Sequence, residues 1–205
     1  SKLRFTLLAA IALLALVLGY LVAALISPSP PLSQPTQTLS LDGSFNLIDE
    51  AGQPVTQDSY EGKFKLVYFG FTYCPDVCPT TMAFLAELKG SLEGTEAAST
   101  DVVMVSVDPA RDTVEQLSTY VPYFHPEFLG VTGDFPDILS FARRFNAPFR
   151  KVTMEDGSYQ MDHSANVVLI NPKGDFHGFF RAPLDLAKMK VTLRSAQYYW
   201  SQQYD

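Results

Sequence analysis

A strand–helix–strand pattern in the middle of the chain most restricts what it can fold into. Residues 64–70 (FKLVYFG) and 101–107 (DVVMVSV) are typical of buried strands, because they are short, mostly apolar and rich in β-branched or aromatic residues. Residues 79–92 between them have the composition of an amphipathic helix. Such a crossover predicts that the two strands lie parallel in one sheet. Ligand sites in sheets of this kind lie at the carboxyl ends of the strands.

Further helices and strands alternate along the rest of the chain. An N-terminal hairpin is expected to turn around residues 50–52, and Asp112 or Thr113 is expected to cap a helix. The expected helices span 111–121, 135–145 and 183–200, and the expected hairpins span 43–55, 149–161 and 166–181. This order predicts an α/β fold with helices on both faces of the sheet.

The N-terminal region has a different character. Two basic residues precede an uncharged apolar run at 5–26, which is long enough to span a bilayer. We therefore expect a single transmembrane anchor at 1–27, with a cleaved signal peptide as the alternative. A Pro-rich linker is expected at 28–38 and the folded domain at 39–205. The positive end stays inside, which predicts an inner-membrane protein whose domain faces the periplasm. The alternative is the mitochondrial inner membrane, with the domain in the intermembrane space.

The charge of the chain narrows the choice of partners. A formal net charge of −7 argues against nucleic acid as a ligand and favours proteins or small ligands. Only two cysteines are present, which is too few for a disulfide scaffold. Because they lie close together in the sequence, they indicate a local site.

These two cysteines, Cys74 and Cys78, follow directly after the first buried strand. A proline after each one disfavours helix at the cysteine, which predicts an extended loop at Cys74 and a helix N-cap at Cys78. Free N–H groups and the helix dipole at that position favour a thiolate. A strand followed by two cysteines at a helix start is the thioredoxin arrangement, although the spacing there is usually C-x-x-C. The wider spacing permits a Cys74–Cys78 disulfide and also leaves room for a metal ion.

A histidine near the C-terminal strands provides a third candidate ligand. In a thioredoxin-like fold, the loop before the last pair of strands faces the cysteines and usually carries a cis-proline. Here that loop contains His163 and no proline. Two thiolates and one imidazole fit a single soft ion, Cu(I) or Zn(II). Structural zinc normally has four protein ligands, so three ligands favour a Cu(I) ion that is later released.

Simpler interpretations stay open for each of these residues. The cysteine pair could be structural, and His163 could be an ordinary hydrogen-bonded loop residue. Asp108 and Asp162 are candidates for supporting contacts around the ligands, although Asp108 is most simply a turn residue before Pro109. The other two histidines, His125 and His177, are interpreted as ordinary hydrogen-bonded loop residues without a metal.

Three segments together resemble a known family. "YCPDVCP", "SVDPARDT" and "DHSANVVLINPKG", after an N-terminal apolar span, are similar to the SCO/SenC copper chaperones of cytochrome c oxidase assembly. The resemblance covers roughly residues 39–200. It implies a thioredoxin-like fold with copper, as Cu(I) or Cu(II), on Cys74, Cys78 and His163. It also implies delivery of copper to the dinuclear site of oxidase subunit II, with other copper chaperones or thiol reductases as further partners.

Two other functions use the same cysteines. A membrane-anchored thiol–disulfide reductase would keep the oxidase copper-site cysteines reduced, and a redox or metal sensor would signal through a membrane partner. On the chaperone interpretation the chain is not an enzyme, apart from an accessory thiol–disulfide exchange activity. His163 discriminates between these functions, because metal binding requires it and thiol exchange does not.

Overall fold

The computed structural model describes residues 13–19 and 45–204. Contacts divide the chain into two units, Ser1–Pro31 and Leu32–Asp205. In the first unit, residues 13–19 are helical and exposed. The rest of the expected anchor and the expected linker at 28–38 lie outside the described residues. Within the described ranges, no helix is long and apolar enough to cross a membrane.

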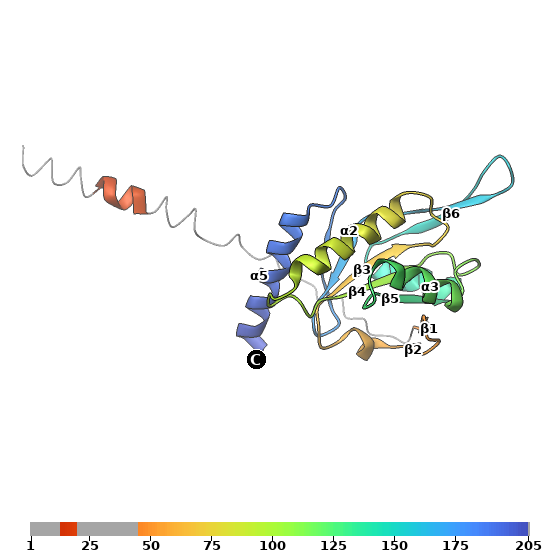
Figure 1. Ribbon diagram of the computed structural model, residues 1–205, viewed down its shortest axis with the longest axis horizontal. Helices are drawn as coiled ribbons and strands as arrows, with labels where there is room; N and C mark the ends of the chain where they lie inside the picture. Colours follow the sequence, from red (N-terminus) through yellow and green to blue (C-terminus); the bar gives the residue numbers. More distant parts are fainter. Residues whose placement is uncertain (1–12, 20–44, 205) are drawn as a thin grey trace, which may run out of the picture. The chain divides into compact units, whose positions relative to one another are not determined.

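A seven-stranded sheet forms the centre of the second unit, in the order β2-β1-β5-β4-β3-β8-β9 (Figure 1). As predicted, β3 and β4 are parallel neighbours, with Lys65 opposite Asp101 and Gly70 opposite Ser106. Every residue of β3 is buried, which explains why the strand is apolar after Lys65. The strands of the sheet are β1 (Leu47–Asp49), β2 (Pro54–Val55), β3 (Lys65–Gly70), β4 (Asp101–Ser106), β5 (Leu129–Gly133), β8 (Val167–Ile170) and β9 (Phe176–Phe180).

The expected N-terminal hairpin is present and joins the main sheet. β1 pairs antiparallel with β2 and also with β5. The sequence prediction contains no strand at β5, because two of its five residues are glycines, which have low strand propensity. Gly133 is required by the pairing itself: a Cβ atom there would lie 2.8 Å from the carbonyl oxygen of Asn46. Tertiary packing therefore overrides local propensity in this strand.

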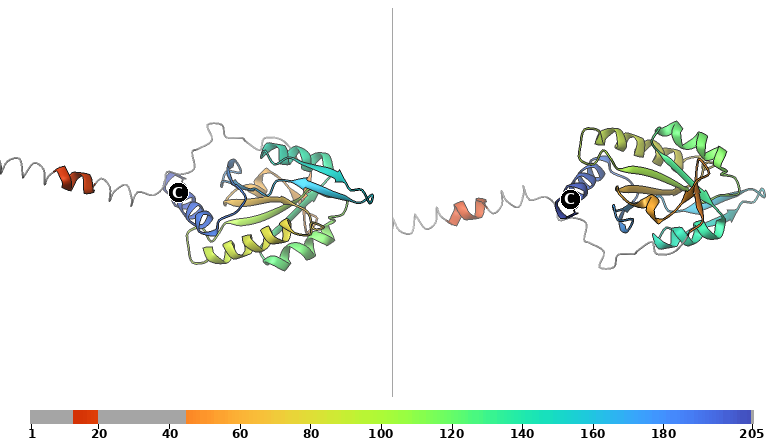
Figure 2. Two further views of the ribbon diagram at one scale, coloured as in Figure 1. Left: turned by 90° about the horizontal axis from the view of Figure 1, so that it is seen from above. Right: turned by 90° about the horizontal axis from the view of Figure 1, so that it is seen from below.

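Helices cover both faces of the sheet, as the α/β prediction requires (Figure 2). α2 (Val77–Leu92) and α3 (Val114–Phe124) lie on one face, and α4 (Phe135–Arg144) lies on the opposite face. α5 (Leu186–Tyr204) packs against α2. A short 3₁₀ helix, η1 (Gln57–Tyr60), follows β2.

The predicted N-cap residues can be compared with the observed first residues of α2 and α3. At α3, the Thr113 side chain accepts a hydrogen bond from the Gln116 N–H at 3.2 Å, which confirms one of the two predicted caps. At α2 the prediction is wrong by two residues, since Asp76 is the N-cap and Cys78 lies within the first turn. Proline is tolerated there at Pro79 because the first N–H groups of a helix have no intrahelical acceptor.

An aromatic cluster fills the space between the sheet and α4. Phe141 of α4 is fully buried, and its ring lies 4.9–6.1 Å from the rings of four neighbours. Those neighbours are Phe45, Tyr60, Phe69 and Phe145. Ring centroids at such separations are typical of favourable aromatic pairs, so this cluster is a main source of packing energy for the α4 side of the core.

A second, two-stranded sheet stands apart from the main one. The expected hairpin of β6 (Phe149–Thr153) and β7 (Tyr159–His163) is present, with Gly157 in its turn at φ +82°. Figure 1 shows it projecting from one end of the main sheet. Its second strand runs further than predicted and ends at His163, so this residue belongs to a strand end and not to a loop. Tyr159, Met161 and His163 alternate along β7 and therefore share one face.

Candidate metal centre

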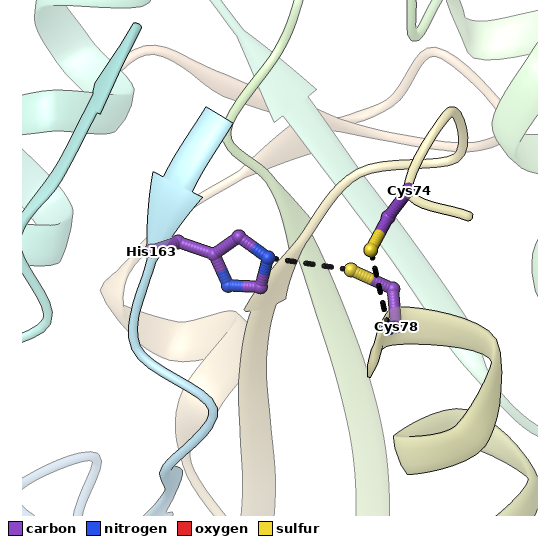
Figure 3. Close-up of side chains that lie close together, drawn as sticks. All are labelled: Cys74, Cys78 and His163. Carbon is purple, nitrogen blue, oxygen red and sulfur yellow. Dashed lines mark hydrogen bonds between the residues drawn. The ribbon is translucent and has the colours of Figure 1, made fainter. Parts of the chain in front are cut away.

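Cys74, Cys78 and His163 come together although 85 residues separate the second cysteine from the histidine. Cys74 lies in the loop after β3, Cys78 in the first turn of α2, and His163 at the end of β7. Figure 3 shows the imidazole ring pointing from the hairpin toward the two sulfurs. Both the strand β3 and the hairpin thus contribute to one site at the carboxyl end of the central strands, where the sequence placed it.

The distances are short enough for one ion. The three ligand atoms all lie within 4.8 Å of one another. The Cys78 Sγ atom is 3.4 Å from Nε2 of His163, and the Cys78 N–H donates to the Cys74 Sγ atom at 3.3 Å. Among the described residues, this is the one group of three or more His, Cys, Asp or Glu side chains that converges in this way. The predicted ligand set is therefore assembled in space.

The hydrogen bonding of His163 leaves Nε2, the ring nitrogen that faces Cys78, available to bind a metal. Its Nδ1 atom lies 3.1 Å from the backbone carbonyl oxygen of Ser164. Because a carbonyl oxygen can only accept, Nδ1 must carry the hydrogen, and the lone pair of the neutral ring is then on Nε2. Nε2 is the nitrogen that faces Cys78. This arrangement is typical of metal-binding histidines, whose second nitrogen is fixed by a hydrogen bond.

Three residues of the β3 end shape the space around Cys78. The Tyr68 hydroxyl donates to the Cys78 Sγ atom at 3.5 Å, and the Phe71 ring packs edge-on against His163 with centroids 5.6 Å apart. Gly70 has no room for a side chain, since a Cβ atom would lie 2.7 Å from the Tyr68 ring and 3.2 Å from the Cys78 sulfur. Tyr68 and Phe71 are both buried, so they belong to the core as well as contacting the ligands.

Burial controls the protonation of the site in the absence of metal. Removal from solvent raises the pKa of the Cys78 thiol to about 12, despite the hydrogen bond from Tyr68 that lowers it. The expectation of a thiolate at this position is therefore wrong for the metal-free chain, because desolvation outweighs the helix terminus. Burial also lowers the pKa of His163, which keeps the imidazole neutral near neutral pH.

The two sulfurs differ in exposure and are not bonded to each other. Cys78 is fully buried and Cys74 is 9% exposed, and both are free thiols. A disulfide requires the sulfurs to approach to about 2.05 Å. The redox disulfide between them stays a prediction.

The two candidate supporting carboxylates use their oxygens elsewhere. Asp108 is buried, accepts a hydrogen bond from the Tyr159 hydroxyl at 2.9 Å and pairs with Arg111. Asp162 is exposed and pairs with Arg150 at 2.9 Å. A role of either carboxylate at the metal stays a prediction. The hairpin residues Arg150 and Asp162 also line a surface pocket beside His163.

Asp112 is a site residue that the sequence interpretation missed. It was considered only as a helix cap, but its buried carboxylate accepts from the Thr72 N–H at 3.0 Å, the Thr72 hydroxyl at 2.7 Å and the Ser106 hydroxyl at 2.7 Å. It thereby ties the start of the cysteine loop to the end of β4. Burial raises the pKa of Asp112. The sequence feature that could have indicated this role is an acidic residue in the segment after β4, because this segment lies at the same edge of the sheet as the cysteines.

The lowered pKa of His163 predicts a pH dependence of folding. In the unfolded chain the imidazole takes up a proton near pH 6.5, whereas the folded chain resists protonation until lower pH. Between these two values the unfolded state binds more protons, so stability falls as the pH falls. We expect the free energy of unfolding of the metal-free chain to drop more between about pH 7.5 and pH 5 than that of His163→Gln. Urea unfolding at both pH values measures this, and equal drops would contradict a buried neutral imidazole.

Comparisons with known proteins agree with this geometry. A sequence model of the family described as SCO1/SenC matches residues 33–197. A SCO2-like protein of Rickettsia conorii is 32% identical over 184 residues, which cover 86% of this chain and 88% of that protein. The mitochondrial SCO1 homolog 1 of Arabidopsis thaliana is 38% identical over 141 residues, or 69% of this chain. The chain spans 42% of the length of this Arabidopsis protein.

Solved structures confirm the fold. Arabidopsis thaliana ScoI with copper bound matches with a TM-score of 0.72 and 35% identity, over 77% of this chain and 98% of that one. Bradyrhizobium japonicum ScoI with copper bound gives a TM-score of 0.67 and 34% identity, over 75% and 98%. The expected thioredoxin-like α/β fold is confirmed by these likenesses. From its sequence, its fold and the placement of its two cysteines and histidine, the chain belongs to the SCO1/SenC family.

Proposed function

We propose that this protein is a copper metallochaperone that binds one Cu(I) ion through Cys74, Cys78 and His163. The observation that carries the proposal is the convergence of the three ligand atoms within 4.8 Å. Two relatives whose structures contain copper have the same fold, which supports copper as the metal. The donor set also fits, because thiolates are soft ligands and select Cu(I) over harder ions.

The number and type of ligands suit an ion that the protein carries and passes on. Three protein ligands leave room for a further ligand from an acceptor protein, so the ion can be passed on by ligand exchange. The chain itself supplies a neutral Nε2 atom and two sulfurs, and copper binding releases the Cys78 proton. We infer that the chain is not an enzyme, apart from an accessory thiol–disulfide exchange.

The acceptor we propose is the dinuclear copper site of cytochrome c oxidase subunit II. The apolar run at 5–26 supports a membrane anchor, which would hold the domain beside membrane enzymes. The net charge of −7 supports a protein partner over nucleic acid. We propose the periplasmic face of a bacterial inner membrane as the location. The alternative is the intermembrane-space face of the mitochondrial inner membrane, in line with the mitochondrial name of the Arabidopsis relative.

A thiol–disulfide reductase is the second candidate function. It is favoured by two neighbouring free thiols at the start of a helix in a thioredoxin-like fold. A redox or metal sensor would use the same groups. The position of His163, with Nε2 aimed at Cys78, favours the chaperone because thiol exchange does not need an imidazole there.

A complementation test separates the two functions. In cells that lack this protein, we expect His163→Ala to fail to restore oxidase activity when copper is scarce, although both cysteines remain. Added copper should restore part of the activity, because mass action can replace delivery by a chaperone. Oxidase activity of membranes, measured at low and high copper, gives the result.

The matched control is His125→Ala. His125 is another histidine, lies outside the site and accepts from the Glu127 N–H at 3.2 Å. This variant should restore oxidase activity fully. Full activity of His163→Ala at low copper, or rescue by an added thiol reductant and not by copper, would favour the reductase.

A further inference from the structure

A cluster of polar and aromatic side chains joins the hairpin that carries His163 to the loop that carries the cysteines. Its centre is Asp108, which is 3% exposed and lies two residues after β4. One carboxylate oxygen accepts from the Tyr159 hydroxyl at 2.9 Å, and the other accepts from the Arg111 Nε–H. Tyr159 is the first residue of β7, four residues before His163. The cluster therefore fixes the strand whose other end supplies the metal ligand.

The Arg111 side chain extends the cluster to the cysteine loop. Its guanidinium carbon lies 4.0 Å from the ring centroid of Tyr159, 5.0 Å from that of Tyr73 and 5.6 Å from that of Phe71. Cations at such distances from aromatic rings are attracted to them. The Phe71 ring in turn packs edge-on against His163. Contacts thus run without a break from Tyr159 through Arg111 and Phe71 to the imidazole.

The hairpin depends on such contacts for its position. Among the residues that the structure describes, β6 and β7 form a two-stranded sheet of their own, separate from the seven-stranded sheet whose strand β3 leads into the cysteine loop. The chain joins His163 to β8, which begins at Val167, and side chains on the inner face of β7 add contacts that help to set the distance between His163 and the sulfurs. Met161 on this face is apolar and buried, whereas Tyr159 adds a directed hydrogen bond.

We propose that Arg111, Asp108 and Tyr159 form a clamp that positions His163 against Cys78 and thereby sets the affinity of the site for copper. The three are positioning residues, and none of them is a metal ligand. The inference rests on the proposed function for its copper readout but also predicts a property of the metal-free chain. Hydrogen exchange of the β7 amides should report how tightly the clamp holds the hairpin.

Tyr159→Phe is the main test, because it removes the hydroxyl and keeps the ring. In the metal-free 205-residue chain, the β7 amides should exchange faster, while amides of β3 and β4 should be unchanged. Competition with a Cu(I) chelator should show about tenfold weaker binding, as expected for the loss of one hydrogen bond to a charged acceptor.

Lys151→Met is the matched control. The Lys151 ammonium lies 3.7 Å from the ring centroid of the same Tyr159 but is on the hairpin itself. Removing this cation should change neither hydrogen exchange at β7 nor copper affinity. A second variant replaces the ion pair as a unit, Asp108→Leu with Arg111→Met, because removing one partner alone would leave a buried unpaired charge.

A double-mutant cycle tests whether the clamp acts through the histidine. When His163→Ala is already present, Tyr159→Phe should weaken copper binding no further. An equal loss in both backgrounds, or normal copper affinity and β7 exchange in both clamp variants, would overturn the proposal. If the unsubstituted chain bound no copper, the proposed function would fail instead, and the exchange data would still decide whether the clamp holds the hairpin.

Discussion

Replacing Cys78 by serine is expected to weaken Cu(I) binding by several hundredfold, up to about a thousandfold. The reason is that a hydroxyl is a hard, neutral ligand where a soft thiolate is needed. Binding free energies of about 10–16 kcal/mol at four-ligand structural zinc sites imply about 2.5–4 kcal/mol per ligand, and the upper end of this range is a factor of nearly a thousand. Competition titration against a Cu(I) chelator measures the loss.

The fold should survive this substitution. Serine is slightly smaller, and its hydroxyl can accept the hydrogen bond that Tyr68 now donates to the Cys78 sulfur. Thermal unfolding of the metal-free variant should therefore stay close to that of the unsubstituted chain. His163→Ala provides the graded comparison, with an expected loss of about a hundredfold, since two thiolates remain to hold the ion. Cys78→Ser binding within tenfold of normal would contradict the three-ligand site.

The second large effect is expected on the free energy of unfolding, when an aromatic ring of the core is removed. Phe141→Ala should lower the free energy of unfolding by about 3–5 kcal/mol, because it leaves a cavity in a fully packed cluster. Phe141 has no exposed surface, and four aromatic rings surround it. Urea or thermal unfolding of the metal-free chain measures the change.

This destabilisation should leave the metal site itself intact. α4 packs on the face of the sheet opposite α2, where Cys78 lies, so the folded fraction of Phe141→Ala should still bind one copper ion. Tyr123→Ala is the matched control, because this ring is 84% exposed on α3 and its removal should cost less than about 1 kcal/mol. Similar losses in the two variants would mean that the aromatic cluster is not the main packing element of the core.

Much of this architecture could be predicted because it depends on local patterns. The parallel pairing of β3 and β4 follows from two apolar runs joined by one helix, and the observed register confirms it. Cys74, Cys78 and His163 could be grouped because the topology brings the end of β3 and the region before β8 to one edge of the sheet. The chemistry of sulfur and imidazole then pointed to a soft metal.

The parts that could not be predicted depend on tertiary contacts. β5 carries glycines that only close approach to β1 explains, and no window of its own sequence shows this. The protonated state of Cys78 reflects a competition between burial and the helix terminus, and burial can be known only from the fold. Likewise, Asp112 and Arg111 act on residues 40 positions away, so their spacing in the sequence carries no signal.

The two sulfurs differ in exposure, so one side of the centre is buried and the other is accessible to solvent. Cys78, in the first turn of α2, is fully buried. Cys74 has 9% of its surface in solvent, and His163 is half-buried and lines a surface pocket. In the part of the chain that the structure describes, the accessible side of the centre is that of Cys74 and His163. On the proposed function, copper would therefore enter and leave on this side, and each transfer would require a partner protein to dock against it.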